Sequence, residues 1–262
     1  MSAAGSGAGI CYLTLPEFRV ANVLRDGWRI FTQNFLLVTS VWVVGNIIGS
    51  PPLWLASHLI PVQQGYLWKA LAVIAVIAAA AWMVAIGTLT DALVVLIVFQ
   101  KYCSQSVALA NNMRRVLSRA VPLILTAMLM GLTVAAGFVA LLVPGCIAVA
   151  AFAVVIPVCV LEQAGPLRSL ERSSDLTRFH RWPILGLVSA SVIIGMVLDK
   201  VVRYVWMSVL QHSNGGLGLA VASGLIGMIP SAFFAVVWVL LYCHLRATKE
   251  NFVPASAMEV LS

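Results

Sequence analysis

The chain has 262 residues, of which 61% are hydrophobic and 10% are charged. A soluble domain carries roughly a quarter charged residues, so this composition excludes a soluble fold that hides its apolar surface in a core. The net charge of +7 indicates membrane topology rather than nucleic-acid binding, because the basic residues stand beside apolar runs. In that position they hold loops in the cytoplasm and meet anionic lipid.

Uncharged runs such as residues 121–143 and 217–241 exceed the roughly 18–20 residues that cross a ~30 Å hydrocarbon core. Only helices and closed barrels satisfy their backbone in lipid. The continuous apolar run at residues 70–81 shows none of the alternation of a barrel strand. We therefore expect an all-α polytopic membrane protein with about six transmembrane helices, arranged as three hairpins with cytoplasmic interfacial helices.

Three regions are expected along the chain. Residues 1–15 form a flexible N-terminus that lacks the basic-then-apolar order of a signal peptide. Residues 16–250 form a single six-helix membrane domain, and residues 251–262 form a C-terminal tail.

The first expected element is an amphipathic helix that a capping box at Thr14 and Glu17 opens. Its apolar and charged residues separate on a 3.6-residue period, with Trp28 placed at the headgroup level. Residues 106–120 repeat this pattern. Both segments predict helices that lie in the membrane interface.

The spans follow from the apolar runs. The first is expected from Phe35 to about Leu55, bent or ended at Pro51 and Pro52. The run at residues 70–99 would measure about 45 Å as one helix, and its sequence leaves open whether it forms one helix or two, with a kink near Gly87.

The later spans are predicted at residues 121–143, 146–161, 182–198 and 217–241, the last with Pro230 inside it. Pro144 and Gly145 predict a tight turn between the third and fourth spans. Between the fourth and fifth spans lies a charged segment, residues 157–183, with a break expected near Ser173 and Ser174. Most of the sixteen Lys and Arg residues fall on one side of this layout, which favours cytoplasmic N- and C-termini.

Asp91 is the one acidic residue inside an apolar run. A carboxylate at membrane depth is costly and by default marks a proton, ion or substrate path. The alternative is that the long helix shifts and places Asp91 at the interface, paired with a basic residue. Both interpretations stay open at the level of sequence.

The charged segment carries the second candidate site. Arg168, Arg172, Arg178 and Arg181 have the chemistry to contact lipid phosphates or a partner. The alternative is that they set topology and pair with Glu171 and Asp175. Structural roles are expected for Pro144, Gly145, Pro157, Glu162 and Gly165.

Cys103, Cys159 and Cys243 fall at the expected cytoplasmic ends of inward helices, with His244 adjacent. They could assemble a metal site, but cysteine also packs well as a small apolar residue, and no ligand-type spacing is present. No metal or other cofactor is expected. The sequence holds no glycine-rich phosphate loop, metalloprotease motif or nucleophile elbow, so we expect no enzyme activity.

The residues of the charged segment that carry a family resemblance are Pro157 to Glu162, Gly165, Leu170, Arg172, Ser173, Leu176, Thr177 and Trp182. Weaker support comes from Val23, Leu24, Trp28, Asn34, Phe35, Pro144, Gly145, Leu241, Tyr242, Arg246, Lys249 and Glu250. They resemble a family of bacterial inner-membrane proteins related to the membrane domain attached to some glycerophosphoryl diester phosphodiesterases. The resemblance implies a six-helix module in the bacterial inner membrane. The phosphodiesterase barrel has no place in it, because six spans use the whole chain. Residues 178–181 depart from the family, which often has a glycine before the Trp182 position.

The expected function is that of a non-enzymatic accessory or scaffold that contacts the lipid bilayer, anionic lipids or a membrane protein partner through its cytoplasmic face, and no nucleic acid. The alternative is a small transporter or lipid-handling protein with a path near Asp91. An enzyme that acts on lipid is a third reading.

Overall fold

The computed structural model describes residues 20–49, 66–103, 105–209 and 216–250. All elements of these ranges are helical. They are α1 (Val20–Gln33), α2 (Phe35–Gly49), α4 (Tyr66–Tyr102), α5 (Leu109–Ser118), α6 (Ala120–Ala140), α7 (Leu142–Ala151), α8 (Val155–Leu161), α9 (Pro166–Thr177), α10 (Arg181–Val209) and α11 (Gly216–Glu250).

Five stretches in the described residues are long and apolar enough to cross a membrane: Ala72–Tyr102, Ala120–Ala140, Leu142–Leu161, Arg181–Leu198 and Met228–Lys249. The number rises to six if α1 and α2, which meet at an angle of 88°, form one bent span. The predicted all-helical class is confirmed for the described residues, and the five or six long apolar helices are compatible with a multi-pass membrane protein.

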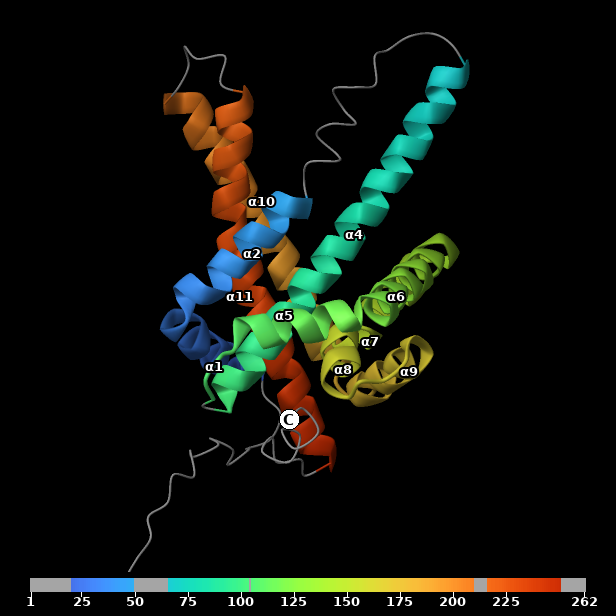
Figure 1. The fold of residues 1–262 in the computed structure, drawn as a ribbon, viewed down its shortest axis with the longest axis vertical. Helices are drawn as coiled ribbons and strands as arrows, with labels where there is room; N and C mark the ends of the chain where they lie inside the picture. Colours follow the sequence, from blue (N-terminus) through green and yellow to red (C-terminus); the bar gives the residue numbers. More distant parts are fainter. Residues whose placement is uncertain (1–19, 50–65, 104, 210–215, 251–262) are drawn as a thin grey trace, which may run out of the picture.

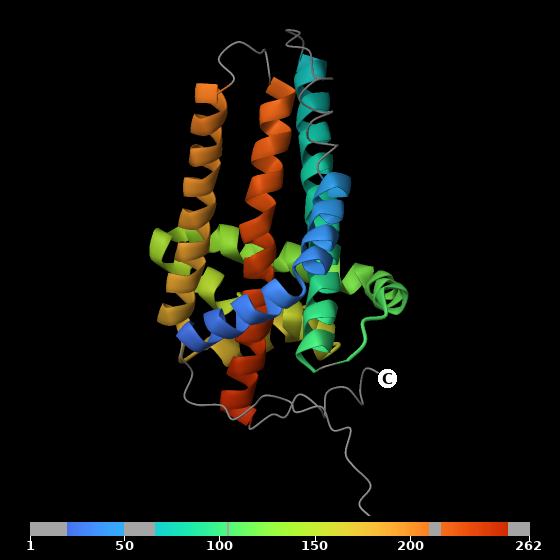
Figure 2. The same cartoon turned by 90° about the vertical axis from the view of Figure 1, so that its left-hand side faces the viewer.

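The helices pack in neighbouring pairs, α2 with α4, α6 with α7 and α10 with α11. Figure 1 and Figure 2 show α10 and α11 running side by side along the long axis of the molecule, whereas α4 meets α11 in the lower half and tilts away from it above. The shorter helices α6 to α9 gather against the lower half of these long helices (Figure 1). The core lies where the two groups meet, because Ala92–Phe99 of α4 and residues 236, 237 and 239–245 of α11 are buried there.

The sequence left open whether residues 70–99 form one helix or two. They lie in a single continuous helix, α4. Gly87 lies inside it, and a side chain at Gly87 would meet nothing within 4 Å. The first half of α4 is exposed, with Val73, Ile74 and Ile77 on its surface. An apolar surface of this kind suits contact with lipid.

The turn between α6 and α7 lies at Leu141, so the predicted turn at Pro144 and Gly145 is wrong. Leu141 has extended backbone angles, and Pro144 lies in the first turn of α7. Proline is tolerated there because the amide it lacks would have no helical acceptor. Gly145 is buried against α6, where an added Cβ would clash with the ring of Phe138. The glycine is therefore used for close helix packing.

The expected break near Ser173 and Ser174 is also wrong, because α9 runs unbroken from Pro166 to Thr177. Gly165 precedes it in an extended conformation and Pro166 occupies the first helical position, an arrangement that favours a helix start. The Ser173 and Thr177 hydroxyls, one turn apart, both donate hydrogen bonds to the carbonyl of Ala151, at 2.8 and 3.2 Å. These bonds hold one face of α9 on α7.

Helices occur at both segments predicted to lie in the membrane interface. On α1, Val23, Gly27 and Phe31 are buried and Trp28 is 61% exposed. On α5, Leu109, Met113 and Leu117 are exposed. The predictions that concern Thr14, Glu17, Pro51, Pro52 and Leu55 lie outside the described residues.

Candidate functional site

The site begins with two prolines in membrane helices. Pro157 has no amide to bond to the carbonyl of Ala153, and its ring crowds that carbonyl. The helix is interrupted there, at residues 152–154, between α7 and α8. Pro230 lies inside α11 and removes a second helical hydrogen bond for the same reason. Irregular backbone at membrane depth is tolerated where it is buried in protein or lines a cavity.

Both prolines line the same cavity, which has a volume of about 440 Å³. This volume falls in the ~300–1,000 Å³ range of small-molecule sites. Its wall comes from α2, α4, α6, α7, α8, α10 and α11 and is mainly apolar. We call it the proline cavity.

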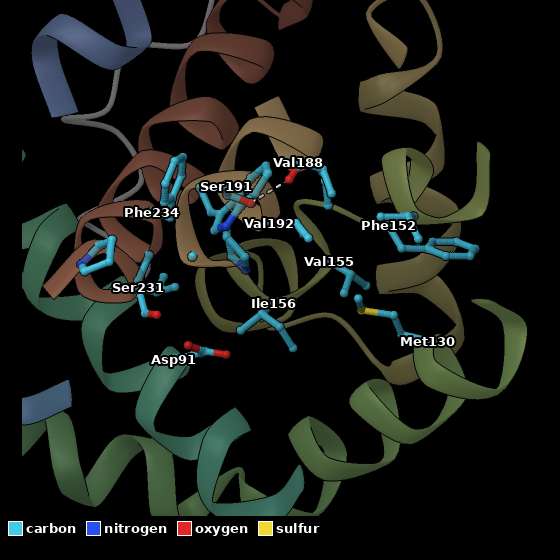
Figure 3. A pocket seen from close by; sticks show the side chains of 18 of the residues that line it. Asp91, Met130, Phe152, Val155, Ile156, Val188, Ser191, Val192, Ser231 and Phe234 are labelled. Carbon is cyan, nitrogen blue, oxygen red and sulfur yellow. Dashed lines mark hydrogen bonds between the residues drawn. The ribbon is translucent and has the colours of Figure 1, made fainter. Parts of the chain in front are cut away.

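Asp91 of α4 lies on the wall of the proline cavity and is the one ionisable residue among its lining residues. Figure 3 shows it toward the end with Ser231 and Ile156, whereas Met130 and Phe152 lie toward the other end. Within the described ranges, no side chain forms a hydrogen bond or ion pair with Asp91. Its carboxylate therefore faces a cavity without a counter-ion from the described residues.

The depth of Asp91 follows from its place on α4. It precedes Gln100 by nine residues of one helix, about 14 Å at 1.5 Å per residue. The Gln100 amide exchanges two hydrogen bonds with the buried Asn112 of α5, at 3.0 and 2.7 Å. If α5 lies in the interface, Asp91 lies about halfway through a ~30 Å hydrocarbon core.

A polar network forms a second centre around Glu162, which ends α8. Arg172 of α9 donates to Glu162 Oε2 at 3.2 Å. From α11, the Tyr242 hydroxyl donates to Glu162 Oε1 at 3.0 Å, and Arg246 lies 3.7 Å from the same oxygen. Arg246 also donates to the Tyr242 hydroxyl oxygen at 2.8 Å. One carboxylate thus joins three helices.

Further contacts extend this network at the same end of the molecule. The Arg119 guanidinium donates to the backbone carbonyl and side-chain oxygen of Gln163, at 3.0 and 2.7 Å. His244 of α11 lies 3.2 Å from the Asp26 carboxylate of α1. We call the region around Glu162, Arg119 and His244 the charged end.

The four arginines proposed to contact lipid or a partner divide into two groups. Arg172 pairs with Glu162, and Arg181 donates to Ser174 at 3.4 Å. Arg168 and Arg178 are exposed, and within the described ranges neither forms an ion pair. Glu171 and Asp175 form none there through their side chains either, although the Asp175 backbone carbonyl accepts from Lys249. Arg168 and Arg178 are thus the arginines of this set left open to an outside group.

The cysteines do not come together as a metal site. In the part of the chain that the structure describes, no group of three His, Cys, Asp or Glu side chains could hold a metal ion. Cys159 and Cys243 are buried among apolar side chains. The Cys159 thiol lies 3.5 Å from the Thr126 hydroxyl.

Sequence reasoning missed the partners of both centres. Tyr242 and Arg246 are separated from Glu162 by about eighty residues, so no local pattern pairs them. Within their own helix, Tyr242 and Arg246 are four residues apart, and this spacing places both side chains on one face of the helix. Trp42 and Trp238, which line the proline cavity, gave no signal beyond that of ordinary membrane aromatics.

Comparison with protein-family models, curated proteins and solved structures gives no match to this chain.

Proposed function

We propose that this chain is a non-catalytic, multi-pass membrane protein that holds a small amphiphilic molecule in the proline cavity, as a small transporter or lipid-handling protein does. The observation that carries the proposal is the Asp91 carboxylate, which lines a mainly apolar cavity and has no partner in the described residues. A buried carboxylate without a partner costs free energy. That cost is accounted for if the cavity receives a molecule or a proton.

The proposed membrane topology follows from the packing of the helices in pairs, α2 with α4, α6 with α7 and α10 with α11. The three helix pairs cross a bacterial inner membrane as three hairpins, with both termini in the cytoplasm. The basic composition of the charged end supports this orientation through the positive-inside rule. The contact of α1 with α11, which includes the Asp26 and His244 pair, supports placing the first and last described helices on one side.

A matched pair of glycines on α10 tests the proposal. Gly195 lines the proline cavity, and a Cβ there would meet nothing within 4 Å. Gly195→Leu therefore fills cavity space without a backbone clash. Gly186→Leu is the control, because Gly186 has equal room on the same helix but does not line the cavity.

The readout is photolabelling of the full chain in lipid vesicles with a neutral, photoreactive single-chain alcohol, followed by peptide mapping. We expect labelling near Met130 and Phe152, reduced at least about tenfold in Gly195→Leu and unchanged in Gly186→Leu. Labelling that is spread over the lipid-facing helices and is equal in both variants would contradict an occupied cavity.

A second candidate function is the accessory or scaffold role at the charged end. Exposed Arg168 and Arg178, which lack ion pairs in the described ranges, favour it, because guanidinium groups bind phosphate and carboxylate oxygens. Two sets of mutations distinguish the cavity function from the scaffold function. Gly195→Leu leaves a scaffold intact, whereas charge reversal at Arg168 and Arg178 removes its contact with anionic lipid or a partner.

A further inference from the structure

The proline cavity has a polar and an apolar end. Asp91 and Ser231 lie toward one end in Figure 3, and Met130, Phe152 and Val155 lie toward the other. The polar groups come from α4 and α11, and the apolar ones from α6 and from the α7–α8 segment. A molecule that fits both ends has one polar head and one apolar tail.

The charged side chain on the described wall of the cavity is negative. Asp91 supplies a carboxylate, and no Lys, Arg or His is among the lining residues of the described chain. Arg172 and Arg246 both lie against Glu162, and neither lines the cavity. A cation that neutralises Asp91 must therefore enter with the ligand or be a proton.

Other groups that line the proline cavity suit a ligand whose polar head is an organic cation better than a ligand with a neutral, hydrogen-bonding head. The Ser191 hydroxyl already donates to the carbonyl of Val188 at 2.7 Å, so it offers an incoming group only an acceptor. Trp42, Trp238 and Phe234 also line the cavity. Aromatic faces attract ammonium groups, most strongly when the site is desolvated.

We propose that the proline cavity selects a single-chain amphiphile with an ammonium head, which pairs with Asp91 while its apolar chain extends toward Met130 and Phe152. This assignment of ligand class rests on the proposed function of the cavity. Its volume of about 440 Å³ favours one chain over a two-chain lipid.

The test uses the full chain in vesicles and the same neutral photoreactive alcohol. Dodecyltrimethylammonium and dodecanol, compared at equal mole fraction in the bilayer, compete against the label. The cation can form an ion pair with Asp91 and contact aromatic faces, which the neutral alcohol cannot do, so we expect the cation to compete about 10- to 100-fold better. Asp91→Asn should abolish that preference, so that the cation and the alcohol compete equally, and Asp91→Glu should restore part of it.

Two results would overturn this ligand class alone, and a third would overturn the proposed function. If the alcohol labels the cavity but the cation competes no better, the cavity is occupied and a proton neutralises Asp91. If the preference persists in Asp91→Asn, the cation acts elsewhere. If the alcohol does not label the cavity at all, the proposed function itself fails, and the ligand class fails with it.

Discussion

At the scale of single residues, Glu162 and Asp91 are two carboxylates in opposite situations. Glu162 accepts hydrogen bonds from Tyr242 and Arg172 and lies near Arg246. Asp91 faces a cavity with no partner in the described ranges. A fully partnered carboxylate stabilises the fold that surrounds it, whereas an unpartnered one is retained for function.

Glu162→Gln tests the stabilising role. The amide keeps the size of the side chain but removes the negative charge that lies beside the partly buried Arg172 and Arg246. We expect a loss of about 2 kcal/mol, measured as a lower temperature at which half of the detergent-purified protein leaves its monodisperse chromatographic peak.

Glu171→Gln is the matched control for that variant. Glu171 is exposed on α9, and surface changes of this kind cost less than about 0.5 kcal/mol. Equal midpoint temperatures for Glu162→Gln and Glu171→Gln would show that the network contributes nothing to stability.

At the scale of elements, the amphipathic helices α1 and α5 and most spans were predictable, because apolar periodicity and run length are local signals. The turn at Leu141 was not. Proline and glycine usually mark turns, and here Pro144 and Gly145 lie inside α7 instead. The continuity of α9 was missed because its support comes from the Ala151 carbonyl, more than twenty residues away.

The contact of α6 with α7 depends on glycine. A Cβ at Gly137 would lie 3.0 Å from the Cα of Gly145 and 3.3 Å from the carbonyl oxygen of Pro144. These are backbone atoms, which cannot rotate away as a side chain can. We expect Gly137→Ala to lower stability by about 1–2 kcal/mol, because overpacking outweighs the better helix propensity of alanine.

Gly131→Ala on the same helix supplies the comparison for Gly137→Ala. A Cβ at Gly131 meets nothing within 4 Å, so alanine should raise stability by up to about 1 kcal/mol. Both variants are measured by the same thermal assay. A Gly137→Ala protein as stable as Gly131→Ala would mean that α6 and α7 are not held this closely.

At the scale of the whole molecule, the sequence predicted the helical class and singled out Asp91, which lines the proline cavity. Asp91 stood out because an acidic residue in an apolar run is unusual at any depth. The cavity around it was not predictable, because its walls come from helices spread from α2 to α11. The network at Glu162 was hidden for the same reason, since Tyr242 reaches it from the last helix.

The two centres lie on shared helices. From Ile156 and Pro157, which line the proline cavity, α8 leads to Glu162 within six residues. Likewise, α11 carries both Trp238, on the cavity wall, and Tyr242, one turn later. The charged end thereby fixes the two helices that carry the prolines of the cavity.

The central claim is that Asp91 lies in a cavity within the membrane. The most direct test places a cysteine at Asp91 in a chain whose five native cysteines are replaced by alanine. Thiol reagents are then applied to each side of sealed vesicles. We predict reaction with a small membrane-permeant maleimide, slowed by Gly195→Leu, and none with a membrane-impermeant reagent from either side. Ready labelling by the impermeant reagent from the charged end would instead place Asp91 at the interface and contradict the account.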